Sequence, residues 1–228
     1  MQFSRQKGFT LVEIAIVLVI VGLLIGGVLK GQEMITNAKL KRVESDNAGI
    51  AAAMFSYQDR YLQLPGDDRD ASDRFSIYQG TGALGANADG DGNGVIGGGD
   101  GWDNPVASSG WGTNTTPGVE ESKFFGHLRA AGLIPGGDGT EGSRPSNAYG
   151  GLIGIQNGSL GLSGHVVIFG QIEGPIAAIL ESRLDDGAAD SGRIQSNTVG
   201  GTNGMDDTSS SDGAVYSNEE RYNMAFRL

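Results

Sequence analysis

The sequence predicts an α+β fold, with one long N-terminal helix at about residues 9–62 packed on a small antiparallel sheet with long loops. Three observations predict this class. Residues 9–29 form an apolar run that contains a single charged residue, Glu13. Apolar and aromatic residues then recur every three or four positions as far as Tyr61, which is the period of an α-helix. The strand signals, which are short runs rich in β-branched residues, come after residue 150.

The apolar run is long enough to cross a membrane. Its 21 residues, at about 1.5 Å per residue, would cover about 30 Å, the thickness of the hydrocarbon core of a bilayer. Backbone groups in lipid must satisfy one another, so this segment is helical if it enters a membrane. Glu13 is the anomaly, because a carboxylate inside a membrane segment is costly and marks a functional site.

Three kinds of N-terminal segment compete for this run. A secretory signal peptide would use the basic residues Arg5 and Lys7, but no small-residue cleavage site follows the apolar run. A plain single-span anchor would give Glu13 no purpose. The third kind uses every feature: a short basic leader, residues 1–8, is cut before Phe9, and the apolar helix stays on the mature protein.

The junction between leader and apolar run has a recognisable pattern. Its residues are Lys7, Gly8, Phe9, Thr10, Leu11, Val12 and Glu13. With the apolar run, they resemble the type IV prepilin family, which includes type IV pilins and type II secretion pseudopilins. The resemblance implies a lollipop-like pilin, cut between Gly8 and Phe9 by a prepilin peptidase that also methylates the Phe9 amine. It assigns Thr10 and Glu13 to assembly and pairs Glu13 with the Phe9 amine of a neighbouring subunit.

The resemblance also implies an organisation, a location and partners. Residues 1–8 are the leader, residues 9–36 the transmembrane and filament-core helix, and residues 37–228 the globular head. The precursor would cross the inner membrane once and meet the prepilin peptidase and an inner-membrane assembly platform. The mature chain would join copies of itself, or other pilins, in an extracellular filament or a periplasmic pseudopilus.

The long helix is expected to continue past the membrane. Seven residues that follow one another at intervals of three or four positions would form a stripe along one face of the helix. They are Leu40, Val43, Asn47, Ile50, Met54, Tyr57 and Tyr61. We interpret this stripe as core packing under a globular head, not as a cofactor site. Leu64-Pro65-Gly66 is expected to end the helix near Leu62, because proline disfavours helix in the preceding residue.

The head is expected to contain further short elements. A helix is predicted at 119–131, with Pro117 before it, and His127 within it is expected to be structural. Strands at 152–155 and 160–172 are predicted to pair through an Asn157-Gly158 turn, with a doubly buried run at 166–169. The remaining predictions are a short helix after Pro175 that ends at Asp186-Gly187, a loop at 197–213 and a final edge strand at 222–228.

Composition narrows the classes of function. The 40 glycines favour many loops, and the absence of cysteine excludes disulfides. The net charge is −11, yet the first 42 residues are net basic, which suits a leader and a lipid surface. The acidic remainder disfavours nucleic-acid binding. His127 and His165 are the two histidines, and the sequence shows no nucleophile–base pattern and no phosphate-binding loop. We therefore do not expect this chain to be an enzyme.

Residues 89–100 carry a pattern typical of calcium loops. An EF-hand loop has oxygen ligands at positions 1, 3 and 5, Gly at 6, a backbone carbonyl at 7 and an acid at 12. The residues at those positions are Asp89, Asp91, Asn93, Gly94, Val95 and Asp100. The final Asp resembles dockerin-type loops, and flanking helices are not evident. The alternative interpretation is an acidic, glycine-rich loop that matches the calcium-loop pattern by chance.

The sequence leaves open whether five other acidic residues also bind metal. They are Asp67, Asp68, Asp70, Asp185 and Asp186. The first three cluster at a Pro65-Gly66-Asp67 junction that resembles one in some prepilin-like proteins, and such a run is more often a solvated turn.

The sequence is compatible with two classes of function. The first is a structural subunit of a type IV pilus or pilus-like filament, with a type II secretion pseudopilin as its variant. The second is a membrane-anchored, calcium-dependent binding protein that never polymerises. The sequence leaves open whether the subunit is major or minor and whether the filament serves adhesion, motility, DNA uptake or secretion.

Overall fold

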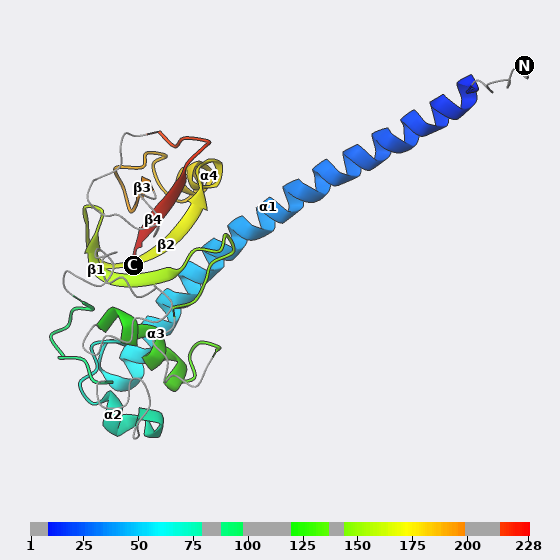
Figure 1. The fold of residues 1–228 in the computed structure, drawn as a ribbon. Helices are drawn as coiled ribbons and strands as arrows, with labels where there is room; N and C mark the ends of the chain where they lie inside the picture. Colours follow the sequence, from blue (N-terminus) through cyan, green and yellow to red (C-terminus); the bar gives the residue numbers. More distant parts are fainter. Residues whose placement is uncertain (1–8, 79–87, 98–119, 137–143, 199–214) are drawn as a thin grey trace, which may run out of the picture. The chain divides into compact units, whose positions relative to one another are not determined.

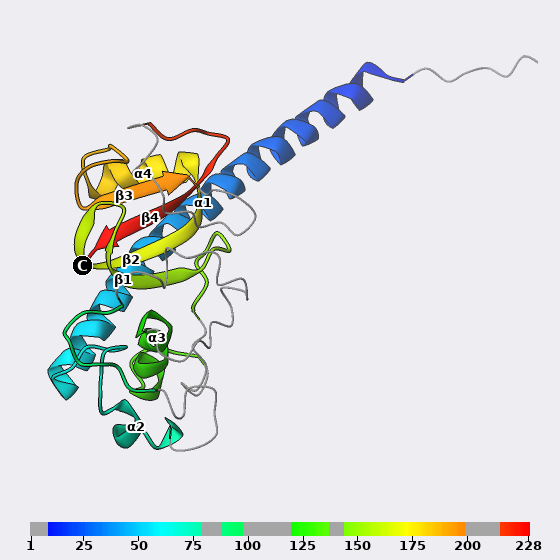
Figure 2. The same ribbon diagram turned by 60° about the vertical axis from the view of Figure 1, so that its left-hand side comes forward.

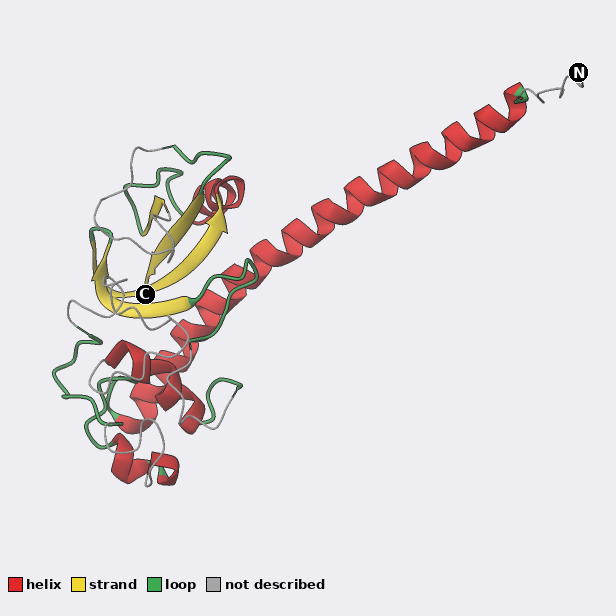
Figure 3. Ribbon diagram, in the orientation of Figure 1, coloured by secondary structure: helices red, strands yellow, loops and turns green. Residues whose placement is uncertain are grey.

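We describe the fold from a computed structural model of the chain. It describes residues 9–78, 88–97, 120–136, 144–198 and 215–228. The chain divides into two units, residues 1–41 and 42–228, which are described separately below. One long helix and a small antiparallel sheet are present (Figures 1 and 3), so the predicted α+β class is confirmed.

Helix α1 runs without interruption from Leu11 to Tyr61, 51 residues. The prediction of a start at Phe9 is off by two residues. The end agrees with the prediction, although the stop comes earlier than the Leu64-Pro65 signal. Leu62 adopts a left-handed conformation with φ of 58°, and its N–H still bonds to the carbonyl of Gln58 at 2.8 Å.

The second half of α1, within residues 42–228, is amphipathic as predicted. Val43, Ile50, Met54 and Tyr57 are buried. Helix α3, Glu120–Ala130, lies close to the end of α1, where the Tyr57 ring stacks on His127 with 6.1 Å between ring centroids. Its predicted span is confirmed to within one residue at each end.

The head contains a four-stranded antiparallel sheet in the order β1-β2-β4-β3 (Figure 2). Its strands and the helices beside them are β1 (Ile153–Ser159), β2 (Leu162–Glu173), α4 (Gly174–Leu184), β3 (Ile194–Thr198) and β4 (Arg221–Arg227). Two short pieces, α2 (Ala71–Arg74) and η1 (Ser76–Tyr78), follow α1. Residues 166–169 of β2 are fully buried, as predicted. Helix α4 contacts β2 and β4.

The turn between β1 and β2 is not where the sequence placed it. Pairing continues past Asn157, which faces His165, to Ser159, which faces Leu162. The turn is Leu160-Gly161, with φ of 51° and 89°, so both residues are left-handed, as in the type I′ turns that suit a hairpin. The predicted Asn157-Gly158 turn is instead the register shift within β1.

Three further expectations about the sheet and α4 need correction. Strand β4 was expected at an edge but lies between β2 and β3. The edge strand next to β4 is β3, whose last two residues fall in the segment expected to be loop. Helix α4 starts at Gly174, one residue before Pro175, and ends at Leu184, before the expected Asp186-Gly187. Burial supports β4 in the centre, because five of its seven residues are buried.

Candidate functional site

The start of α1 is closed by a reciprocal pair of hydrogen bonds. The Thr10 backbone N–H donates to Glu13 Oε2 at 2.8 Å, and the Glu13 N–H donates to Thr10 Oγ1 at 3.3 Å. The Thr10 hydroxyl also donates to Glu13 Oε2 at 2.8 Å. This is a capping box, in which the residue before the helix and the third helical residue satisfy each other's backbone N–H groups. It assigns Glu13 a partner within its own chain.

The two oxygens of Glu13 have different surroundings. Both hydrogen bonds from Thr10 end on Oε2. Within the described part of the chain, Oε1 has no bond, and the residue is exposed. Phe9, next to the cap, is 83% exposed. Gly8 lies outside the described residues. A carboxylate with one oxygen fixed and the other open can accept a further donor without losing its cap.

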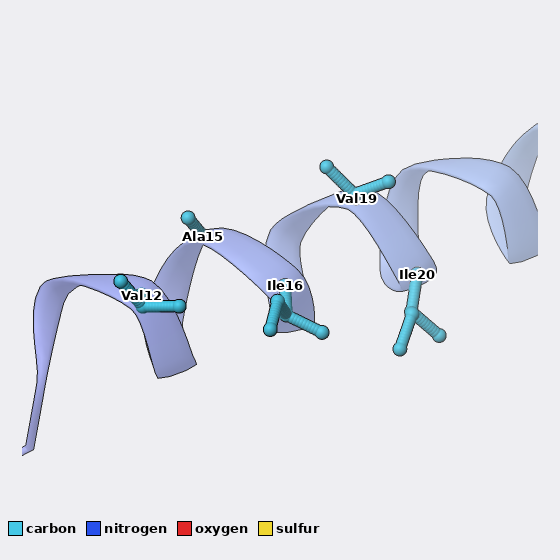
Figure 4. Close-up of a pocket in the computed structure, with 5 residues that line it drawn as sticks. All are labelled: Val12, Ala15, Ile16, Val19 and Ile20. Atoms are coloured by element: carbon cyan, nitrogen blue, oxygen red, sulfur yellow. The ribbon is translucent and has the colours of Figure 1, made fainter.

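The first turns of α1 present a continuous apolar surface. All residues from Phe9 to Lys30 are exposed. Figure 4 shows the short Ala15 between Val12 and Val19, which leaves a shallow depression of about 320 Å³ that Ile16 and Ile20 also line. A depression of this kind accepts the side chain of another apolar helix. By length and composition, α1 is able to cross a membrane; its most apolar 18-residue window has a mean hydropathy of 2.8.

A second candidate site lies in the head at residues 88–97. Two acids from outside this loop hold its backbone. Asp67 accepts from Asn93 N at 3.0 Å and from Gly94 N at 2.7 Å, and Glu120 accepts from Asp91 N at 3.0 Å and from Gly97 N at 2.9 Å. Asp67 and Glu120 are both buried. Glu120 was not predicted at this site, because its position in the first turn of α3 gives no local signal.

The predicted calcium ligands are distributed as follows. Both oxygens of Asp89 accept bonds from Ser72, from its N–H at 2.7 Å and from its hydroxyl at 2.8 Å. Asp91 and Asn93 face each other, with Asn93 N 2.9 Å from Asp91 Oδ1. Asn93 Oδ1 accepts from Val95 N at 2.7 Å. Asp100 lies outside the described residues.

The structure brings three carboxylates together at this loop. One oxygen each of Asp67, Asp91 and Glu120 lies within 4.8 Å of the others. Burial raises the pKa of Glu120, and the hydrogen bonds from Asp91 and Gly97 offset only part of this effect. Lys123, which donates to the Asp89 carbonyl at 2.6 Å, supplies a nearby positive charge. The donor set is all oxygen, which suits a hard cation such as Ca²⁺.

Asp68 and His127 hold the junction after α1 in place. Tyr57 Oη donates to Asp68 Oδ2 at 2.6 Å, and Arg74 Nε does so at 3.1 Å. Burial raises the pKa of Asp68, but these hydrogen bonds outweigh it and hold the pKa below its usual value. His127 Nδ1 accepts from Gly66 N at 2.9 Å, while Nε2 lies 2.8 Å from the Ala88 carbonyl. His127 is therefore a structural link, as expected.

Comparison with known proteins bears on the N-terminal site. Residues 3–29 match the family described as prokaryotic N-terminal methylation motif. No curated protein and no solved structure matches the chain. The matched segment contains the predicted cleavage junction, the capping box and the first turns of α1. The motif supports a prepilin-type, pilin-like protein, which is a class of structural subunits that assemble with other pilins after peptidase processing.

Proposed function

We propose that this chain is a structural subunit of a type IV pilus or pilus-like filament. A prepilin peptidase cuts between Gly8 and Phe9 and methylates the new Phe9 amine. The subunit then leaves the inner membrane, and its apolar helix joins a filament core. A type II secretion pseudopilus is the nearest alternative, since it uses the same N-terminal chemistry.

The observation that carries the proposal is the different surroundings of the two carboxylate oxygens of Glu13. Its Oε2 caps α1 through Thr10, and Oε1 remains open on an exposed apolar helix. In a filament core, Oε1 accepts the Phe9 ammonium of a neighbouring subunit. A carboxylate and an ammonium attract strongly in a low-dielectric core, and either one alone is costly there. The pair therefore fixes the axial register between subunits as well as adding affinity.

The test is to shear cells that express this chain and analyse the released material. Filaments whose main protein starts at a methylated Phe9 support the proposal. Release of no filament, with the protein retained in the membrane, favours the non-polymerising anchored binding protein. Filaments found in the periplasm and absent from the sheared fraction favour the pseudopilus.

We also propose that the loop at residues 89–100 binds Ca²⁺. Support comes from the loop motif, with Asp89, Asp91, Asn93, the Val95 carbonyl and Asp100 as its ligands. Asp67 and Glu120 draw this loop together and place carboxylate oxygens beside Asp91. Exported modules bind calcium with affinities of about 10⁻⁴–10⁻³ M, so weak binding would be sufficient outside the cell.

A further inference from the structure

The last turn of α4 buries a carboxylate. Glu181 is fully buried, and its Oε2 accepts a hydrogen bond from Tyr216 Oη at 3.0 Å. Its Oε1 is also buried and has no hydrogen-bond partner among the described residues. An ionised oxygen that is buried without a partner is costly, so an oxygen in this position calls for a proton or a cation.

Two further acids follow Glu181 directly after the helix. Asp185 Oδ2 accepts hydrogen bonds from the backbone N–H groups of Arg193 and Ile194. The Ile194 N to Oδ2 distance is 2.7 Å. Asp186 Oδ1 accepts a hydrogen bond from Ala188 N at 2.9 Å, and Asp186 Oδ2 accepts one from Ser191 Oγ at 2.6 Å. These bonds fold the loop between α4 and β3 back over the end of the helix.

The three acids converge on one point and form no ion pair with a described residue. One oxygen each of Glu181, Asp185 and Asp186 lies within 4.8 Å of the others. None of the ion pairs made by the described residues includes any of the three, and Arg183, the closest base in sequence, pairs with Glu44 at 3.8 Å. Burial, together with the charges of Asp185 and Asp186, raises the pKa of Glu181 to about 7.

We propose that Glu181, Asp185 and Asp186 form a binding site for a divalent cation, and that Ca²⁺ is the ion it takes. This site is separate from the loop at residues 89–100 and does not depend on the proposed filament function. The cation supplies the missing partner of Glu181 Oε1 and neutralises the like charges around it.

The spacing and chemistry of the acids favour Ca²⁺. Its oxygen ligands lie at 2.3–2.6 Å, so two ligands on one ion are at most about 5 Å apart, which accommodates the observed separation. Ca²⁺ accepts six to eight oxygens in irregular geometry, and exposed Asp186 leaves room for water among them. Mg²⁺ demands a near-ideal octahedron at 2.0–2.1 Å and loses its water reluctantly, so three carboxylates beside a folded loop suit it less well.

The site would stabilise the edge of the sheet. Glu181 belongs to α4, Asp185 and Asp186 begin the loop that leads to edge strand β3, and Tyr216 lies just before β4. A bound cation therefore ties the end of α4 to the start of the loop that leads to β3, and the Tyr216 hydroxyl links Glu181 to the segment before β4. The chain has no cysteine, so no disulfide performs this role.

The experiment measures calcium binding by the full-length chain in detergent micelles. The chain carries Asp91→Ala, which weakens the loop at residues 89–100. Isothermal titration and thermal melting with 1 mM CaCl₂ or chelator are compared with and without Glu181→Gln. We expect one calcium per chain in the Asp91→Ala protein, and at least tenfold weaker binding after Glu181→Gln. Absence of any binding in the Asp91→Ala protein overturns the proposal.

Two controls keep the result decisive. Glu219→Gln removes one exposed acid elsewhere in the head and should leave calcium affinity unchanged. Glu181→Gln keeps an oxygen for the Tyr216 hydroxyl and removes a buried charge, so in chelator it should melt at the same temperature as its parent or higher. Asp186→Asn, at an exposed position, should also weaken binding tenfold. Unchanged affinity in both Glu181→Gln and Asp186→Asn contradicts the site.

Discussion

Thr10 and Glu13 close the first turn of α1 by exchanging hydrogen bonds, Thr10 N to Glu13 Oε2 at 2.8 Å and Glu13 N to Thr10 Oγ1 at 3.3 Å. Capping and the proposed pairing with a neighbouring subunit are thus separable tasks of one carboxylate. The cap needs an oxygen acceptor at position 13, whereas pairing with an ammonium needs the negative charge.

We therefore predict that Glu13→Gln keeps α1 capped and the protein in the membrane but abolishes most filaments. The amide oxygen still accepts the Thr10 N–H, while the charge that would pair with a neighbour's Phe9 amine is gone. Electron microscopy and subunit counts of sheared filaments measure this effect. Thr10→Val, which removes the hydroxyl but keeps the carboxylate, should reduce filaments less than Glu13→Gln does. Normal filaments from Glu13→Gln as the sole subunit would count decisively against the pairing.

Processing provides a second prediction. Gly8→Val should leave the leader attached, because a branched side chain would stand directly before the bond that is cut. Mass spectrometry should then find a chain that is heavier by the eight leader residues and lacks a methyl group on Phe9. Gly22→Val is the matched control, since nothing lies within 4 Å of a Cβ at Gly22. Its chain should be cut normally, and cutting of the Gly8→Val chain at Phe9 would contradict the assigned junction.

Local periodicity explains why part of this fold could be predicted. The three- and four-residue spacing up to Tyr61 fixes α1, and Phe124, Phe125 and Leu128 do the same for α3. The capping box also has a sequence signal, Thr-x-x-Glu before an apolar run. Thr10 and Glu13 fit that signal, whereas the cost of Glu13 in a membrane predicted a partner in another subunit.

The missed features depend on contacts between distant residues. Strand β3 is polar in sequence and exists because it pairs with β4, with Ile194 facing Phe226. The turn at Leu160-Gly161 places a leucine in a left-handed conformation, which no propensity favours. Asp67 and Glu120 are far in sequence from the backbone they hold. Propensity and pattern are local quantities, so they carry no information about such pairings.

Close packing around Gly90 leads to a third prediction. A Cβ at Gly90 would overlap the backbone of Asp67 and Gly66. Because backbone atoms cannot move aside as a flexible side chain does, Gly90→Ala should destabilise the head by about 1–3 kcal/mol. Gly49→Ala is the control in α1, where nothing lies within 4 Å of a new Cβ, and it should stabilise by about 0.5–1 kcal/mol. Equal melting temperatures for both variants would refute this view of the loop.

Calcium binding at residues 89–100 gives the fourth prediction. In a full-length chain carrying Glu181→Gln, so that the α4 site does not contribute, calcium at 100 times its dissociation constant should stabilise the head by about 2.7 kcal/mol. Asp91→Ala should remove this stabilisation and leave cleavage at Gly8 unchanged. Thermal melting with calcium and with chelator measures it, and Asp59→Ala, an exposed acid on α1, serves as the control. Identical melting with and without calcium would mean that the loop is only a glycine-rich turn.

The fifth prediction concerns pH and His127. Burial lowers the pKa of His127 to about 4 from an ordinary 6.5, although the Ala88 carbonyl at Nε2 opposes this shift. The unfolded chain therefore takes up a proton first as the pH falls. This contribution to stability is complete above pH 6.5 and is lost progressively toward pH 4. The difference between the two pKa values corresponds to about 3 kcal/mol, at about 1.4 kcal/mol per unit.

Melting of the full-length chain between pH 7 and pH 4 tests this prediction in three proteins. The parent should lose stability steeply, and His127→Gln should lose about 3 kcal/mol less over the same interval, whatever its stability at pH 7. His165→Gln removes the other histidine, which is less buried, and should keep most of the parent's slope. Parallel pH profiles for the parent and His127→Gln would show that His127 carries its proton in the folded head. In that case its Nδ1 would not be the acceptor for Gly66.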